Sequence, residues 1–289
     1  MHIRRLSPLL FLTTSVGLYS QPAVPGPPKL PDWVEMHANI PYSSYGATKL
    51  DVMVPKNAKP GSRPGVIVIH GGGWTGGTKE SQVVPICLRY LEKGFVVANV
   101  EYRLANDALA PAAVEDALKA ADWVFKNASK YKIDKKRIVV TGGSAGGHLA
   151  LMVGMTPASA NLGKAVKVRA VVNFYGITDV ADQLSGANAR TYATTWLPER
   201  PDRLEVAKRA SPMTYVRKNL PPVLTLHGDS DQTVPYQHGV NLTEALKKAG
   251  AQAELITVPK GRHGFPPEKL DELYPKIFDF LKKNGVITE

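Results

Sequence analysis

Three widely separated segments carry side chains that together could drive nucleophilic catalysis. They are GGSAGG, which contains Ser144, HGDSDQTVP, which contains Asp231, and GRHGF, which contains His263. A serine hydroxyl is a weak nucleophile until a histidine takes its proton and a carboxylate orients that histidine. The chain order serine, acid, histidine is one of the known orders for such a group. We therefore expect Ser144 to be the nucleophile, Asp231 the acid and His263 the base.

The glycines around Ser144 predict a sharp turn between a strand and a helix. Residues 142–146 read GGSAG, which fits the pattern G-x-S-x-G, and a turn of this kind pushes the serine hydroxyl into the open. Side chains at positions 142 and 146 would crowd each other, and Gly147 would let the helix pack close to the sheet. The alternative is a glycine-rich loop with an incidental serine. The apolar run before Ser144 and the helical pattern after it favour the turn.

The acid and the base are chosen by their positions after later strands. Asp229 and Asp231 both follow the apolar run VLTLHG. Asp231 lies deeper in the loop and is the expected acid, whereas Asp229 is expected to cap the turn. His263 lies in a glycine-flanked loop after the last apolar run and is the expected base. The other histidines weighed for this role are expected to be packed, bracing or surface residues, and they are His70, His148, His227 and His238.

Backbone amides are expected to supply an oxyanion hole. Attack on an ester carbonyl places negative charge on its oxygen, and fixed N–H donors must meet that charge. Ala145 follows the nucleophile at the start of a helix and provides one donor. The segment HGGGWTGG, residues 70–77, follows a buried apolar run. Its glycines allow the amides of Gly71 and Gly72 to point inward, which completes the expected hole.

Aromatic residues near this site are candidates for the substrate pocket. Trp74 lies in the glycine-rich segment and is expected to line the acyl pocket. Residues 176–212 fit no single crossover helix. Tyr175 immediately precedes this stretch, and Tyr192 and Trp196 lie within it. The stretch has two interpretations, a long surface loop or a lid that forms one wall of the substrate pocket.

The glycine-rich segment also fits a competing pattern. Gly71, Gly73 and Gly76 form G-x-G-x-x-G after an apolar run, and Glu101 ends the next run, as in a dinucleotide-binding fingerprint. However, GWTGGTKE is a poor start for a helix, and Glu101 comes late for the acidic position. A dinucleotide site would also leave the serine, acid and histidine segments unexplained.

Strands and helices that could position these residues alternate along the chain. Apolar runs rich in β-branched residues, typical of strands buried on both faces, lie at 66–70, 95–100, 138–142, 170–175, 223–228 and 253–258. Two further strands are expected near 33–39 and 49–54, and helical patterns lie near 81–92, 111–129, 144–155, 236–249 and 267–284. This alternation predicts one α/β domain over residues 32–289. Its mostly parallel eight-stranded sheet is expected to carry helices on both faces and a small insertion after the sixth strand.

Composition and the first residues limit the partners. The chain has 289 residues and a net charge of +11, but its basic residues are scattered, so no nucleic-acid partner is expected. A single cysteine, Cys87, excludes an intrachain disulfide and a thiolate metal cluster. Residues 1–20 are expected to be an export signal, with a disordered tail as the alternative, and 21–31 a proline-rich linker. No stable membrane insertion is expected, and the protein is expected to be exported to the periplasm or secreted.

The segments HGGGW, VEYRLA, PAAVEDALKA, TGGSAGGHLAL, HGDSDQTVP and GRHGF resemble the α/β-hydrolase superfamily. Within it, the chain from about Asp51 to Leu281 is similar to hormone-sensitive-lipase-like and bacterial feruloyl- and acetyl-esterase-like carboxylesterases. The resemblance implies hydrolysis of short-acyl or carbohydrate-linked esters through an acyl-enzyme, without a cofactor. The expected partner is therefore a small-molecule or polysaccharide ester.

Two other functions share parts of this pattern. A serine peptidase of the prolyl-oligopeptidase type uses the same three residues, but it usually carries an extra domain that the sequence does not show. A binding module on the same fold would need no catalysis. The complete set of serine, acid, histidine and both oxyanion segments argues against such a module.

The expected mechanism predicts that activity is lost in acid. A histidine accepts a proton only when it is neutral, and histidine side chains in general have a pKa of about 6.5. The rate of ester hydrolysis should therefore fall as the pH drops below about 6.5. A rate that stays flat from about pH 5 to about pH 8 would contradict a histidine base.

Overall fold

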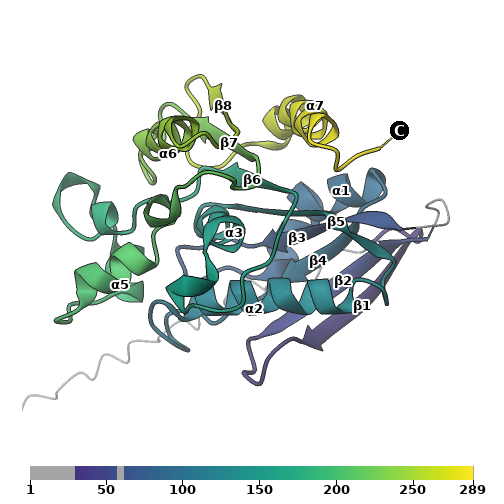
Figure 1. Cartoon of the computed structure of the whole chain (residues 1–289), viewed down its shortest axis with the longest axis horizontal. Helices are drawn as coiled ribbons and strands as arrows, with labels where there is room; N and C mark the ends of the chain where they lie inside the picture. Colours follow the sequence, from purple (N-terminus) through teal and green to yellow (C-terminus); the bar gives the residue numbers. More distant parts are fainter. Residues whose placement is uncertain (1–29, 57–61, 289) are drawn as a thin grey trace, which may run out of the picture.

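The computed structural model describes residues 30–56 and 62–288, and an eight-stranded sheet forms its centre (Figure 1). The strands lie in the order β1-β2-β4-β3-β5-β6-β7-β8. β2 pairs antiparallel with both β1 and β4, and all other neighbours are parallel. The bounds are β1 Val34–Pro41, β2 Lys49–Pro55, β3 Arg63–Ile69, β4 Val96–Val100, β5 Ile133–Gly143, β6 Ala170–Phe174, β7 Val223–Gly228 and β8 Ala253–Val258. The expected mostly parallel sheet is confirmed.

Helices cover both faces of the sheet, so its central strands are apolar on both sides (Figure 1). In β3, Ile67 and Ile69 belong to one buried cluster, and Val66 and Val68 belong to the other. The first cluster contains residues of α2 (Ala112–Asn127), α3 (Ala145–Met155) and α6 (Gln237–Lys248). The second contains residues of α1 (Leu88–Glu92) and α7 (Pro267–Lys283). This arrangement explains why the strand sequences do not alternate between polar and apolar residues.

Two elements differ from their expected form. The helix expected over 81–92 is a 3₁₀ turn at Lys79–Gln82, a π-helical turn at Val83–Cys87 and the short α1. Pro85 lies in the π-helical turn and has no N–H to donate, which breaks a regular α-helical ladder. β5 begins at Ile133 rather than 138, and its pairing with β3 shifts register between Arg63 and Gly65. Residues 134–137 read DKKR and are half-buried or exposed, so no apolar run marks the beginning of β5 in the sequence.

The segment between β6 and β7 is folded into short helices. It contains α4 (Thr191–Trp196) and α5 (Arg203–Arg209), with 3₁₀ turns at Ala181–Gln183, Gly186–Asn188 and Pro212–Tyr215. Trp196 stacks on Trp74 with ring centroids 4.1 Å apart, and its carbonyl accepts the N–H of Ala110 at 2.9 Å. These contacts fasten the insertion to the loops at the carboxyl ends of β3 and β4.

The expectations for the N-terminus fall on residues that the structure does not describe. The export signal, 1–20, lies wholly outside the described residues, and so does the linker up to residue 29. Within 30–56 and 62–288, every helix is too short or too polar to cross a membrane.

A buried ion pair ties α2 to the loop after β4. The Arg103 guanidinium donates to both oxygens of Asp116 at 2.8 Å, and the Arg103 N–H donates to the same carboxylate at 3.1 Å. The side chains of Arg103 and Asp116 are 12% and 1% exposed. This pair fixes the segment VEYRLA against PAAVEDALKA.

Removing Asp116 should destabilise the fold because it leaves a charged guanidinium without its buried partner. We expect Asp116→Ala to lower the free energy of unfolding by about 3–5 kcal/mol in urea titrations. Asp122 on the same helix pairs with Lys126 and Lys164 at the surface. As the control, Asp122→Ala should cost less than about 1 kcal/mol. Equal losses in the two variants would show that the pair at Asp116 has no special importance.

Candidate active site

Ser144 occupies the sharp turn between β5 and α3. Its backbone has φ 57° and ψ −123°, a conformation that non-glycine residues rarely adopt. A Cβ on Gly142 would lie 2.6 Å from the carbonyl carbon of Gly146, and a Cβ on either glycine would overlap the carbonyl oxygen of Ile69. The serine caps no N–H of α3 with its hydroxyl. The glycines therefore permit a turn that presents this hydroxyl to the carboxyl edge of the sheet.

The three residues singled out in the sequence lie in one hydrogen-bonded row. Ser144 Oγ is 2.9 Å from His263 Nε2, and His263 Nδ1 is 2.8 Å from Asp231 Oδ2. The carboxylate can only accept, so Nδ1 donates to it and Nε2 is left to accept the serine proton. Ser144 follows β5, Asp231 follows β7 and His263 follows β8, and these parallel strands all end at the same edge of the sheet.

Asp231 is buried but remains ionised. Its other oxygen, Oδ1, accepts the N–H groups of Thr233 and Val234 at 2.8 and 3.0 Å. Burial alone would raise the pKa of Asp231, but hydrogen bonds from His227 and His263 and from the Val234 N–H hold it well below its usual range. His227 Nε2 lies 3.4 Å from Asp231 Oδ2 and 3.0 Å from the Val234 carbonyl. The acid is therefore a fixed negative charge beneath the imidazole of His263.

The neighbouring carboxylate has a structural position. Asp229 Oδ1 accepts the N–H of Lys260 at 2.7 Å and the hydroxyl of Ser230 at 3.1 Å. It therefore braces the loop that carries His263, rather than capping its own turn through the backbone. This contact explains why two aspartates follow β7 while only Asp231 reaches the imidazole.

The other histidines lie away from the Ser144 hydroxyl and have partners of their own. His148 donates to the Ala210 carbonyl at 2.6 Å and accepts from Trp74 Nε1 at 3.1 Å, and burial lowers its pKa to about 4. His70 Nε2 lies 2.6 Å from Glu101 Oε1. Glu101 is the acidic residue of the competing dinucleotide-binding pattern, in which it would contact a ribose. His238 was expected at the surface, which is wrong. It is 5% exposed because the insertion covers it, and Thr178 donates to it at 3.0 Å.

The glycine-rich segment lies against the serine turn. A Cβ on Gly71 would meet the Gly143 carbonyl oxygen at 2.7 Å and Ser144 Cβ at 3.4 Å. Within the described residues, the N–H groups of Gly71, Gly72 and Ala145 have no hydrogen-bond acceptor. Ala145 is the first residue of α3, so its amide also lies at the positive end of the helix. These amides remain available to an oxygen beside Ser144 Oγ.

A cavity of about 380 Å³ opens in front of Ser144. The residues that line it come from the glycine-rich segment, the turn, the insertion and the acid and histidine loops, and they include Gly71, Gly72, Gly73, Gln82, Ser144, Tyr175, Tyr192, Thr233 and His263. The ring of Tyr175 packs edge-on against His263 with centroids 4.8 Å apart. The insertion supplies Tyr192, whose hydroxyl donates to Gln183 at 2.7 Å. Among the described residues, no group of three His, Cys, Asp or Glu side chains is placed to hold a metal ion.

Two of the three pocket candidates need correction. Tyr175 lines the cavity, but Trp74 and Trp196 do not. Both indoles are fully buried and stacked on each other, and Trp74 also contacts His148 and Tyr192. Stacking gives these large apolar rings more contact with each other than an open cavity would provide. They support the wall of the cavity from behind.

Sequence reasoning missed several lining residues. Thr233 lies two positions beyond Asp231, and Gly73 adjoins the glycines that were assigned. Adjacency would have been enough to find both. Tyr192 lies in the stretch 176–212, for which a pocket wall was one of the two interpretations, but it was not assigned to the pocket individually. Gln82 lies at the end of a 3₁₀ turn with no motif around it, so no sequence signal marked it.

Comparison with known proteins places this geometry in a family. The BD-FAE family model matches residues 50–246. Esterase LipQ of Mycobacterium tuberculosis (strain ATCC 25618 / H37Rv) is 30% identical over 86% of this chain and 61% of its own length. A truncated carbohydrate esterase from gut microbiota is 30% identical with a TM-score of 0.77, covering 86% of this chain and 96% of the other. Thermogutta terrifontis esterase 2 phosphonylated by sarin is 25% identical with a TM-score of 0.77, covering 92% and 100%.

The match extends over fold and sequence together. The chain spans about three fifths of the length of the curated relatives it matches, as with LipQ at 61%. Both solved structures named above are nearly fully covered, so the eight-stranded sheet described here is the α/β-hydrolase fold. Because the family model spans well over half of its residues, this chain belongs to the BD-FAE family.

Proposed function

We propose that the protein is a serine carboxylesterase that hydrolyses short-acyl or carbohydrate-linked esters, such as acetyl or feruloyl esters, through an acyl-enzyme. The observation that carries this proposal is the continuous row from the Asp231 carboxylate through His263 to Ser144 Oγ. The row ends in a cavity whose wall holds unbonded glycine amides in the described part of the chain. Acyl transfer needs both features at one place.

In the first half of the reaction, Ser144 Oγ attacks the ester carbonyl carbon while its proton passes to His263 Nε2. Asp231 accepts the Nδ1 proton in a hydrogen bond and stabilises the imidazolium that forms. The carbonyl oxygen becomes negative and is met by the amides of Gly71, Gly72 and Ala145. The tetrahedral intermediate then collapses. The bond between the acyl carbon and the alcohol oxygen breaks, the imidazolium gives its proton to that oxygen, and the alcohol leaves.

In the second half, water replaces the alcohol. His263 takes a proton from a water molecule, and the oxygen of that water attacks the acyl carbon bonded to Ser144 Oγ. The same amides hold the oxyanion again. Collapse breaks the acyl–oxygen bond, and His263 returns the proton to Ser144 Oγ. The carboxylic acid is released, and the site is restored without any group outside this chain except water.

The relatives and the cavity support the class of ester. One solved relative is described as a carbohydrate esterase, and a cavity of about 380 Å³ suits a short acyl group better than a long one. Tyr175 and Tyr192 present aromatic walls at this cavity, which suit a feruloyl ring or a sugar face. A panel of p-nitrophenyl esters, acetylated xylan and a dipeptide anilide tests the class. Turnover of the anilide in preference to every ester would contradict the proposal.

Replacing the nucleophile should abolish turnover without unfolding the protein. We expect Ser144→Ala to lower kcat on p-nitrophenyl acetate by several orders of magnitude, up to about 10⁶. The control is Ser129→Ala, an exposed serine before β5 at the opposite edge of the sheet, which should leave kcat unchanged. A fluorophosphonate probe should label the wild-type protein and Ser129→Ala, but not Ser144→Ala. Near-normal turnover by Ser144→Ala would exclude it as the nucleophile.

The two aspartates after β7 should differ sharply. Asp231→Asn keeps the shape of the side chain but removes the charge that fixes the His263 tautomer, so kcat should fall by about 10⁴. Asp229→Asn, which alters only the brace to Lys260, should change kcat by less than about tenfold. Steady-state rates of the two variants decide the assignment. A larger loss in Asp229→Asn would transfer the role of acid to that residue.

A further inference from the structure

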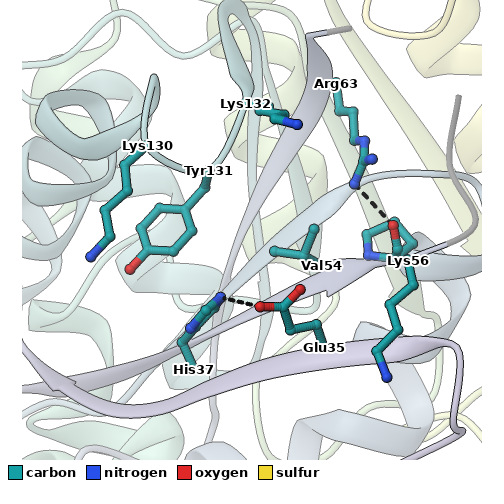
Figure 2. A pocket seen from close by; sticks show the side chains of 9 residues that line it. Glu35, His37, Val54, Lys56, Arg63, Lys130, Tyr131 and Lys132 are labelled. Atoms are coloured by element: carbon teal, nitrogen blue, oxygen red, sulfur yellow. Dashed lines mark hydrogen bonds and ion pairs between the residues drawn. The ribbon is translucent and has the colours of Figure 1, made fainter. Parts of the chain in front are cut away.

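A second cavity, of about 430 Å³, opens at the other end of the sheet (Figure 2). Lys56 follows β2, Arg63 begins β3, and Lys130, Tyr131 and Lys132 immediately precede β5. We call this the basic cavity, and its remaining lining comes from Glu35, His37, Val54 and Pro55. Because β5 joins Lys132 to Ser144, a rise of about 3.3 Å per residue places the two cavities roughly 35 Å apart. The basic cavity is therefore separate from the candidate active site.

Positive charge dominates the basic cavity. Figure 2 shows Lys56, Lys130 and Lys132 around its rim, and all three are exposed. Lys130 and Lys132 have no carboxylate partner among the described residues, and Lys56 Nζ donates to the Asp32 carbonyl at 2.8 Å, which neutralises no charge. The one carboxylate in the lining, Glu35, lies 3.2 Å from His37 Nε2. An acidic ligand would therefore meet several cations and a single carboxylate.

The form of the cavity favours a polymer over a small anion. Each exposed lysine gains little from one ion pair in water, and no helix N-terminus contributes to the lining to cradle a single phosphate. A chain with a carboxylate on successive units engages several lysines at once, and the contacts reinforce each other through effective concentration. The repeated charge of such a chain matches lysines that lie on different elements.

The aromatic side chains of the basic cavity argue against a nucleic-acid ligand. Tyr131 is 6% exposed and packs against His37 with ring centroids 5.4 Å apart. Its face is covered, and the ammonium of Lys130 lies 5.1 Å from the ring centroid. Single-stranded nucleic acid binds through exposed aromatic faces on which bases stack, and the basic cavity offers none. The half-buried Val54 adds an apolar side chain to the lining of the basic cavity.

We propose that the basic cavity binds carboxylate-bearing polysaccharide, in which uronate units meet Lys56, Lys130 and Lys132. The proposal rests on the carbohydrate-ester function proposed above. Binding at the amino ends of the parallel strands leaves Ser144, at the carboxyl ends, open to another part of the same polymer. The basic cavity thus raises the local concentration of ester groups near the candidate active site without touching the ester that reacts.

Affinity electrophoresis of the full chain through gels that contain polygalacturonate tests this proposal directly, because it measures binding without turnover. The wild-type protein and Ser144→Ala should both be retarded, and retardation should weaken as salt is added. The retardation of K130E/K132E should be at least about fivefold weaker than that of the wild-type protein. The matched control is K247E/K248E on α6, which changes charge equally at a distant exposed site and should be retarded like the wild type after correction for mobility in a plain gel.

Each other outcome has a defined meaning. Absence of retardation in polygalacturonate, equal retardation in neutral dextran, equal loss in K247E/K248E, or stronger retardation by single-stranded DNA would overturn the proposal. Thermal melting checks that K130E/K132E is folded, and Lys56→Glu, on a different element, repeats the test if it is not. If the wild-type protein hydrolyses none of the esters but is still retarded by polygalacturonate, the proposed function is wrong and the basic cavity remains a polysaccharide site.

Discussion

The candidate site depends on one close approach of two backbones. The chain leaves β5, turns at Ser144 and enters α3 so near the end of β3 that the Ile69 carbonyl oxygen fills the space of a side chain at 142 or 146. Any residue but glycine at these positions would push α3 away from the sheet. The same approach forces Ser144 into its positive φ and brings Gly71 against Gly143. The close approach of β3 to the turn therefore positions both the nucleophile and the glycine amides.

Around this turn, the structure holds charge in place. The Asp231 carboxylate is fixed by two backbone amides and lies near two imidazoles, so its position does not depend on a flexible side chain. On the other side of the cavity, His70 bonds Glu101 and the Gly71 carbonyl, and it stacks on Tyr102 at 4.3 Å. The acid loop and the glycine-rich segment are thus braced by buried polar contacts before any substrate arrives. Such preorganisation favours stabilisation of the developing oxyanion.

The sequence predicts the sheet and the triad well because both follow from local rules. Buried parallel strands leave apolar runs, and Ser144, Asp231 and His263 each lie in the turn or loop that follows one. The insertion is less predictable, since its helices are short and its position depends on contacts with distant residues. Trp74 and Trp196 illustrate this. An aromatic residue near a site can line a cavity or support its wall, and only the stacked geometry distinguishes these roles. Gln82 reaches the cavity from the end of a 3₁₀ turn, which no motif in the sequence marks.

The stacked indoles of Trp74 and Trp196 also make the junction optically visible. Two of the four tryptophans of the chain lie face to face at 4.1 Å, close enough for their excited states to couple. One comes from the glycine-rich segment and the other from the insertion that carries Tyr192. Any movement of the insertion relative to that segment alters the overlap of the two rings. Near-ultraviolet circular dichroism and intrinsic fluorescence therefore report on this boundary without an added label.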